Sequence, residues 1–162
     1  MATKAKIAIP DGYHTITAHL TLDSAAQAID WYKKALGAEE VSRAVGPDGM
    51  IMHADLRIGD SHIMMNDAMM GSKGPKEVGG SPASLWLYVE DCDGLFNRAV
   101  SAGAQVKMPM GDQFWGDRCG TLLDPYGYGW TIATHKEDVT GEEMQQRQAE
   151  FMKKFAQQAA HT

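Results

Sequence analysis

Ionisable side chains alternate along one short segment, at His53, Asp55 and Arg57, and His62 follows just after Gly59-Asp60. Alternate residues of a strand share one face of a sheet, and Gly59-Asp60 suits a two-residue hairpin turn that would place Arg57 opposite His62. An imidazole beside a carboxylate can act as a general base or orient a polar ligand. The segment predicts either a polar sheet face that lines a site or a face that is merely solvated, as on many antiparallel sheets.

Two aromatic side chains favour the first alternative. Between residues 84 and 90, Trp86 and Tyr88 alternate with apolar residues and so share one face of the expected strand. Large aromatic rings are poorly placed in open water. We therefore expect this face to line an interior hollow.

A loop at residues 111–118 offers a third set of candidate ligand contacts. Phe114 and Trp115 could stack on a flat ligand, and Arg118 could hold a carboxylate. Alternatively, Trp115 closes the mouth of the hollow and Arg118 forms a structural ion pair with Asp117 or Asp112. The sequence leaves both interpretations open.

The elements that must position these side chains occur twice in the same order. A strand over residues 13–22 carries apolar side chains on one face and His19 on the other, and a helix over 25–36 ends at Gly37. Strands over 39–45, 50–58 and 61–66 follow. The order recurs over 84–90, 91–102, 105–110, 118–123 and 129–135, and the helix stops Gly37 and Gly103 lie 66 residues apart. This internal repeat predicts an α+β fold built from two βαβββ modules.

A further helix is expected at the C-terminal end of the chain, over residues 139–160. Thr140 and Glu143 have capping-box spacing, and Phe151 and Phe155 lie near one apolar stripe. Such a stripe fits packing on the same chain or against a second copy, and we expect a homodimer. The modules are expected at residues 13–70 and 83–136, and together with the helix they should form one domain.

Composition excludes two classes of partner. The formal net charge is -6 and the sequence pI is about 5.4, which argues against nucleic-acid binding because that function needs a basic surface. No stretch has the roughly 20 apolar residues of a membrane span, and residues 1–10 lack the apolar core of a signal peptide. The chain has only two cysteines, Cys92 and Cys119, which we expect to be reduced. These features predict a cytoplasmic protein without membrane or nucleic-acid partners.

Several separated motifs resemble those of a known family. Residues 28–39 (AIDWYKKALGAE) resemble a signature of the glyoxalase/bleomycin-resistance, or vicinal oxygen chelate, superfamily. Residues 52–61 (MHADLRIGDS), 114–118 (FWGDR) and 124–130 (DPYGYGW) are more specifically similar to its PhnB-like branch. The resemblance implies the glyoxalase/bleomycin resistance/dihydroxybiphenyl dioxygenase fold plus a C-terminal helix. It does not imply one activity, because the superfamily includes isomerases, ring-cleaving dioxygenases, epoxide-opening resistance enzymes and proteins that only sequester drugs.

The resemblance also implies where a metal ion would bind. Members that use a divalent ion hold it with side chains from four strands, and the corresponding positions here are Thr17, Met64, Ser84 and Thr131. None of these is a good ligand for a divalent transition metal, which prefers imidazole, carboxylate or thiolate. We therefore predict no metal and no other cofactor. A displaced divalent-metal site would have to draw on His19, His53, Asp55 and His62.

These observations support three hypotheses. The first is a metal-independent protein that binds a small molecule in a cup between the modules. The second is a metal-dependent lyase, isomerase or dioxygenase of the same superfamily, and the third is mainly a dimeric interaction module. The candidate catalytic residues are His19, His53 and Asp55. The candidate ligand contacts are His19, His53, Asp55, His62, Trp86, Tyr88, Phe114, Trp115 and Arg118.

Overall fold

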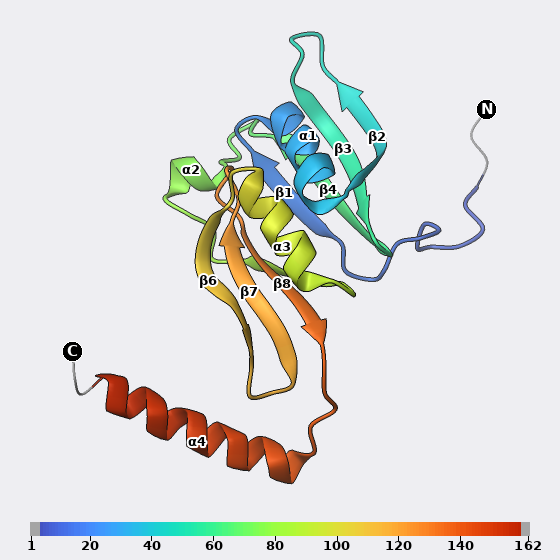
Figure 1. Ribbon diagram of the computed structural model, residues 1–162. Helices are drawn as coiled ribbons and strands as arrows, with labels where there is room; N and C mark the ends of the chain where they lie inside the picture. Colours follow the sequence, from blue (N-terminus) through green and yellow to red (C-terminus); the bar gives the residue numbers. More distant parts are fainter. Residues whose placement is uncertain (1–3, 160–162) are drawn as a thin grey trace.

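Two βαβββ units follow one another in the computed structural model, which describes residues 4–159 (Figure 1). The first unit contains β1 (Ala18–Leu22), α1 (Ala25–Leu36), β2 (Glu39–Val45), β3 (Ile51–Ile58) and β4 (Ser61–Asp67). The second unit contains β5 (Ser84–Tyr88), α3 (Cys92–Ser101), β6 (Gln105–Asp112), β7 (Asp117–Leu123) and β8 (Gly129–His135). The linker holds a short helix, α2 (Pro75–Val78), and the chain continues into α4 (Gly141–Ala159). The predicted α+β fold of two βαβββ modules plus a C-terminal helix is confirmed.

Each unit has a four-stranded mixed sheet of the same topology. The strand orders are β1-β4-β3-β2 and β5-β8-β7-β6, and the first strand of each unit pairs parallel with the last. In the first hairpin, Asp55 lies opposite Met64 and Arg57 opposite His62. This is the register that the two-residue turn at Gly59-Asp60 predicts, so His62 and Asp55 share one face of the sheet.

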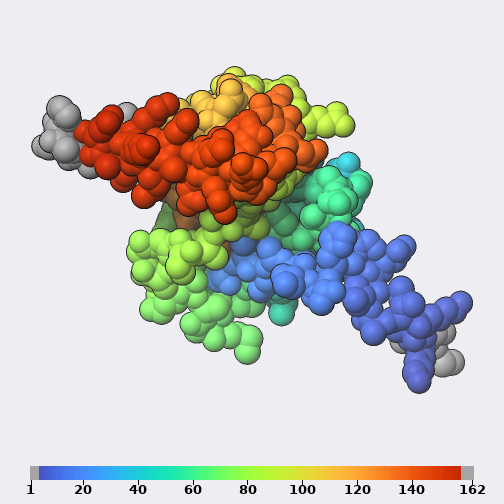
Figure 2. Space-filling model, turned by 90° about the horizontal axis from the view of Figure 1, so that it is seen from below, coloured from blue at the N-terminus to red at the C-terminus, as the bar shows by residue number. Residues whose placement is uncertain are grey.

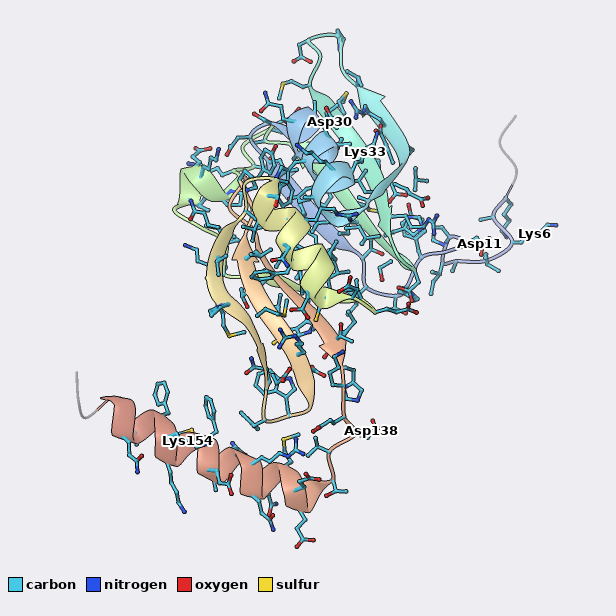
Figure 3. All side chains as sticks on the ribbon, viewed as in Figure 1. Lys6, Asp11, Asp30, Lys33, Asp138 and Lys154 are labelled. Atoms are coloured by element: carbon cyan, nitrogen blue, oxygen red, sulfur yellow. The ribbon has the colours of Figure 1, made fainter. Side chains whose placement is uncertain are left out.

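The helices cover the other face of the sheets. The buried residues of α1 recur at helical spacing, and Ile29 and Tyr32 are the largest of them. Asp30 and Lys33 lie on the outer side of the same helix (Figure 3). The helix ends at Gly37, whose left-handed backbone (φ 70°) favours glycine. The core therefore lies between each helix and its sheet, and the opposite sheet faces are left for other contacts.

The first strand is shorter than predicted. It begins at Ala18 rather than at Tyr13, and Ile16, which was expected on its apolar face, is exposed. The strand pairs only with β4, where Ala18 lies opposite Ile63 and β4 itself starts at Ser61. A strand reaching back to Tyr13 would have no partner beyond that point. Residues 10–17 instead form an irregular segment, here named the N-terminal arm.

A buried carboxylate joins the two units. Asp124 accepts hydrogen bonds from the hydroxyl of Tyr32 on α1 (2.7 Å) and from the indole N–H of Trp130 on β8 (2.9 Å). The helices α1 and α3 lie side by side in Figure 1, and Arg98 of α3 donates to the carbonyl of Ala35. The units are therefore fixed relative to each other by bonds that neither could make alone.

The helix α4 extends along the surface (Figure 2), across the end of the β6–β7 hairpin (Figure 1). Its first turn is capped by Thr140, whose hydroxyl accepts from the Glu143 N–H. The ring of Phe151 packs 5.2 Å from that of Phe114, while Phe151 and Phe155 both stay exposed. No helix within residues 4–159 combines the length and apolar character needed to cross a membrane.

Candidate functional site

A groove of about 470 Å³ opens where β1 and β4 of the first unit approach β5 of the second. Its walls are mainly apolar, with Ile16 and Ile63 on one side. Trp86 and Tyr88 line the other side and remain 49% and 58% exposed. Their ring centroids are 6.1 Å apart. His62 is the imidazole that lines the groove, so this site brings together residues from both units.

A buried carboxylate orients His62 from behind. Asp55 is only 2% exposed, and its two oxygens lie 3.0 and 2.9 Å from Nδ1 of His62. Because an ionised carboxylate can only accept, Nδ1 carries the proton, and Nε2 of the neutral ring is an acceptor. That Nε2 faces Gly12, where an added Cβ would lie 3.1 Å away.

The N-terminal arm covers this pair. The hydroxyl of Tyr13 donates a hydrogen bond to Asp55, and its ring stacks on His62 with 4.2 Å between centroids. The bond to Asp55 raises the pKa of Tyr13 above its usual value. Figure 3 shows Asp11 on the same segment, just outside the sheet. The arm therefore closes one side of the polar face that the strand pattern predicted.

A second buried carboxylate lies behind Tyr88. Asp117 is 3% exposed and accepts from Tyr88 Oη at 2.8 Å, from Trp115 Nε1 at 2.9 Å and from His135 Nδ1 at 2.8 Å. Burial opposes ionisation of Asp117, but the hydrogen bonds from His135, Tyr88 and Trp115 outweigh it and lower the pKa of the carboxyl. The same bonds raise the pKa of Tyr88 and of His135.

The remaining predicted contacts lie away from the groove. His19 is exposed on β1, opposite Met64, and His53 lies half-buried on β3, opposite Ala44. Of the predicted ligand contacts, His62, Trp86 and Tyr88 line the groove. Asp55 does not line it but hydrogen-bonds His62.

The side chains of the 111–118 loop that were predicted to contact a ligand contact other side chains of the protein instead. Phe114 packs edge-to-face on Trp115 and against α4, and the indole of Trp115 bonds Asp117. Arg118 is not paired with Asp117. Its guanidinium instead forms ion pairs with Asp93 (2.7 Å) and Asp112 (3.1 Å). Arg118 is therefore already occupied by two carboxylates of its own chain.

The positions implied for a metal do not fit one. The hydroxyl of Thr131 is 3.0 Å from that of Thr121, and Thr131 is buried. Met64 and Ser84 offer a thioether and a hydroxyl, which are weak ligands for divalent transition metals. Within residues 4–159, no three side chains of His, Cys, Asp or Glu gather closely enough to hold an ion.

The sequence reasoning missed Tyr13 and His135, and it named Asp117 only as a possible ion-pair partner of Arg118. Antiparallel pairing of the two strands that flank residues 124–128 could have placed His135 opposite Asp117. No comparable signal exists for Tyr13, because the strand pattern extends through it.

Comparisons with known proteins agree with this architecture. The sequence model described as Glyoxalase/Bleomycin resistance protein/Dioxygenase superfamily matches residues 13–132. An uncharacterized protein of Mycobacterium bovis, Mb0911c, is 43% identical over 135 residues, which is 80% of this chain and 89% of that protein.

Solved structures show the same fold. The crystal structure of TioX from Micromonospora sp. ML1 superposes with a TM-score of 0.61 at 26% identity, covering 78% of this chain and all of that one (100%). The PhnB protein of Bacillus cereus gives a TM-score of 0.58 at 20% identity and covers 75% of this chain and 99% of its own. At that level of identity, the second likeness speaks for the fold alone.

Proposed function

Because the chain belongs to the Glyoxalase/Bleomycin resistance protein/Dioxygenase superfamily, we propose that it binds a small organic molecule in the groove between its two units. The observation that carries the proposal is the exposed aromatic pair Trp86 and Tyr88, which shares one groove with His62. A volume of about 470 Å³ falls within the range of roughly 300–1,000 Å³ that is usual for small-molecule sites. Apolar walls would supply affinity, and the few polar groups would orient the ligand.

Trp86 is the residue whose exposure most favours a ligand. About half of Trp86 faces solvent, on the wall of a groove that is mainly apolar. A flat ring laid on it would remove apolar surface from water and stack with the indole, which is worth about 0.5–1.5 kcal/mol beyond the area buried. We therefore assign Trp86 as the main stacking contact, Tyr88 as its neighbour and His62 as the polar contact held by Asp55.

The proposal is tested with 1-naphthalenemethanol as a flat, uncharged probe, by equilibrium dialysis. We expect saturable binding that Trp86→Ala weakens about 5-fold or more, because the stacking contact is lost. Val106→Ala is the matched control, since Val106 is also an exposed apolar side chain of the second unit but lies on β6. Binding that is insensitive to Trp86→Ala, or equally sensitive to Val106→Ala, would contradict the proposal.

The proposal includes a homodimer in which α4 contacts a second copy. Helices in proteins are stabilised mainly by packing of their apolar face, yet α4 touches its own chain chiefly through Phe151 and the Arg147–Glu137 ion pair. Phe151 and Phe155 present an apolar stripe to solvent. A second copy offers the same stripe, and two such stripes can pack on each other about a two-fold axis.

Sedimentation velocity tests this part of the proposal. We expect a dimer for the native chain and a monomer for the double variant Phe151→Ser/Phe155→Ser. The control is Gln146→Ser/Lys153→Ser, which changes the opposite side of α4 and should remain dimeric. A monomeric native protein would refute the dimer without touching the groove.

We also propose that the protein acts in the cytoplasm and without a metal ion. The thiols of Cys92 and Cys119 are both buried and unpaired, which suits a reducing compartment. Elemental analysis of protein purified without chelator should find well under one equivalent of any divalent transition metal per chain. A stoichiometric metal would favour the metal-dependent enzyme instead.

A further inference from the structure

We infer that the groove selects flat ligands that donate hydrogen bonds or carry positive charge, and that it rejects anions. This inference rests on the proposed function and names the ligand class of the same site. It follows from where the side-chain protons around the groove point and from where the charges lie.

The polar hydrogens next to the groove are already used by the protein. Tyr88 has a single O–H, and it is donated to Asp117 at 2.8 Å. The Nδ1–H of His62 is directed at Asp55, and the O–H of Tyr13 is donated to the same carboxylate. Tyr88 Oη keeps a lone pair on the wall of the groove. The groove therefore presents an acceptor, and no free side-chain O–H of Tyr88, to a ligand.

The indole N–H of Trp115 is also already used by the protein. It donates to Asp117 at 2.9 Å. The outer edges of β1 and β5 add backbone N–H and C=O groups in similar measure, so they favour neither sign. Side chains alone therefore decide the preference.

The charges near the groove have the same sign. Asp60 lines it directly, and the carboxylates Asp55 and Asp117 lie immediately behind His62 and Tyr88. Among the lining residues in the described part of the chain there is no lysine and no arginine. A carboxylate, sulfonate or phosphate would thus meet acceptors and negative charge, and it would lose its hydration without gaining a partner.

The nearby arginines do not offset the negative charge at the groove. Arg57 lies opposite His62, but its guanidinium is bound to Glu39 and to the Gly59 carbonyl. Arg118 is held by Asp93 and Asp112. An ammonium group, by contrast, could donate to the Tyr88 oxygen and lie over the indole of Trp86, which is a favourable cation–π arrangement.

Three probes of one ring system separate charge from shape. They are 1-naphthylmethylamine (cation), 1-naphthalenemethanol (neutral) and 1-naphthoate (anion), each measured by equilibrium dialysis near neutral pH at low and high salt. We expect the cation to bind about 10-fold or more tightly than the anion, with the neutral probe between them. Trp86→Ala should weaken both the cation and the neutral probe, and the cation by the larger factor, because it also loses the cation–π contact.

Two charge variants locate the preference in the groove. Asp60→Asn should lower the cation-to-anion ratio about 2-fold or more, whereas Glu150→Gln, which removes an exposed charge on α4, should leave the ratio unchanged. Salt should reduce the ratio only in part, because Asp55 and Asp117 are buried. Equal effects of the two variants would mean that overall charge, not the groove, sets the preference, and would overturn the inference.

The outcomes for the inference and for the proposed function are distinct. If the anion binds as tightly as the cation and Trp86→Ala weakens both, the inference is wrong and the proposed function stands. If no probe binds, or none responds to Trp86→Ala, the proposed function itself is wrong.

Discussion

The two units place a buried carboxylate on the same kind of sheet face but build its surroundings differently. In the first unit, Asp55 lies within β3, its imidazole partner His62 is nearly buried (9% side-chain exposure), and its tyrosine comes from outside the sheet. In the second unit, Asp117 begins β7 and its partner His135 is half exposed (53%). Its tyrosine, Tyr88, belongs to the edge strand itself.

The difference shows that the internal repeat reproduces the backbone and not the polar clusters. By strand register, Asp55 corresponds to Thr121 and His62 to Gly129, because Met64 lies opposite Asp55 and Thr131 lies opposite Thr121. Thr121 bonds Thr131, and Gly129 has no side chain. Equivalent positions therefore make different side-chain contacts. Each carboxylate cluster must be tested separately.

The largest effect is expected at the second carboxylate. Asp117→Ala removes the buried carboxylate that accepts from three donors, so the free energy of unfolding should fall by about 3 kcal/mol. Urea denaturation measures this, with Asp112→Ala as the exposed control. A loss below about 1 kcal/mol would mean that water replaces the carboxylate and that the cluster is not structural.

The first carboxylate should matter less for stability and more for the arm. Asp55→Ala removes the acceptor for Tyr13 and His62, and we expect a loss of about 2 kcal/mol. Hydrogen exchange of residues 11–17 should accelerate, because the arm loses its anchor. Asp117→Ala serves as the comparison, since it should leave exchange of the arm unchanged at conditions where both variants are folded. Equal acceleration in the two variants would contradict separate clusters.

The sequence predicted the scaffold well and the clusters in part. Strand parity and the turn at Gly59-Asp60 correctly paired Arg57 with His62, because both signals are local and periodic. The arm was assigned to a strand because alternation continues past the point where β4 can pair with it. Asp112, which the sequence offered as a partner of Arg118, does pair with it. The other partner, Asp93, lies 25 residues before Arg118, and no periodicity identifies such a contact.

Solution pH should affect the half-exposed imidazole. Its bond to Asp117 raises the pKa of His135, so the stabilisation from this pair is present below the ordinary histidine value and is lost as pH rises through the raised pKa. The lowered pKa of Asp117 gives stabilisation that is present above the ordinary carboxyl value and lost as pH falls through the lowered one.

Thermal melting from about pH 5 to about pH 9 tests this window. The Tm difference between the native chain and His135→Gln should be greatest in the acidic half of that range and shrink towards its alkaline end. A difference that stays constant would show that the histidine acts by packing alone. The effect should be modest, because half of the side chain is in water.

The smallest effect is expected at Arg118. Arg118→Gln removes two ion pairs on the surface, which should cost less than about 1 kcal/mol, and it should leave the dissociation constants of all three naphthalene probes unchanged within about 2-fold. Dialysis and urea denaturation measure the two quantities. Selective loss of 1-naphthoate binding would return Arg118 to the ligand-binding residues.

The hydrogen bonds of the buried Asp124 carboxylate affect how the protein unfolds. Its side chain is held by donors from both halves of the chain, Tyr32 on one side and Trp130 on the other, and water cannot easily replace either of them. Either half released from the other would expose an unsatisfied interior face. Thermal unfolding should therefore be a single cooperative transition. We expect neither half to fold as an isolated fragment.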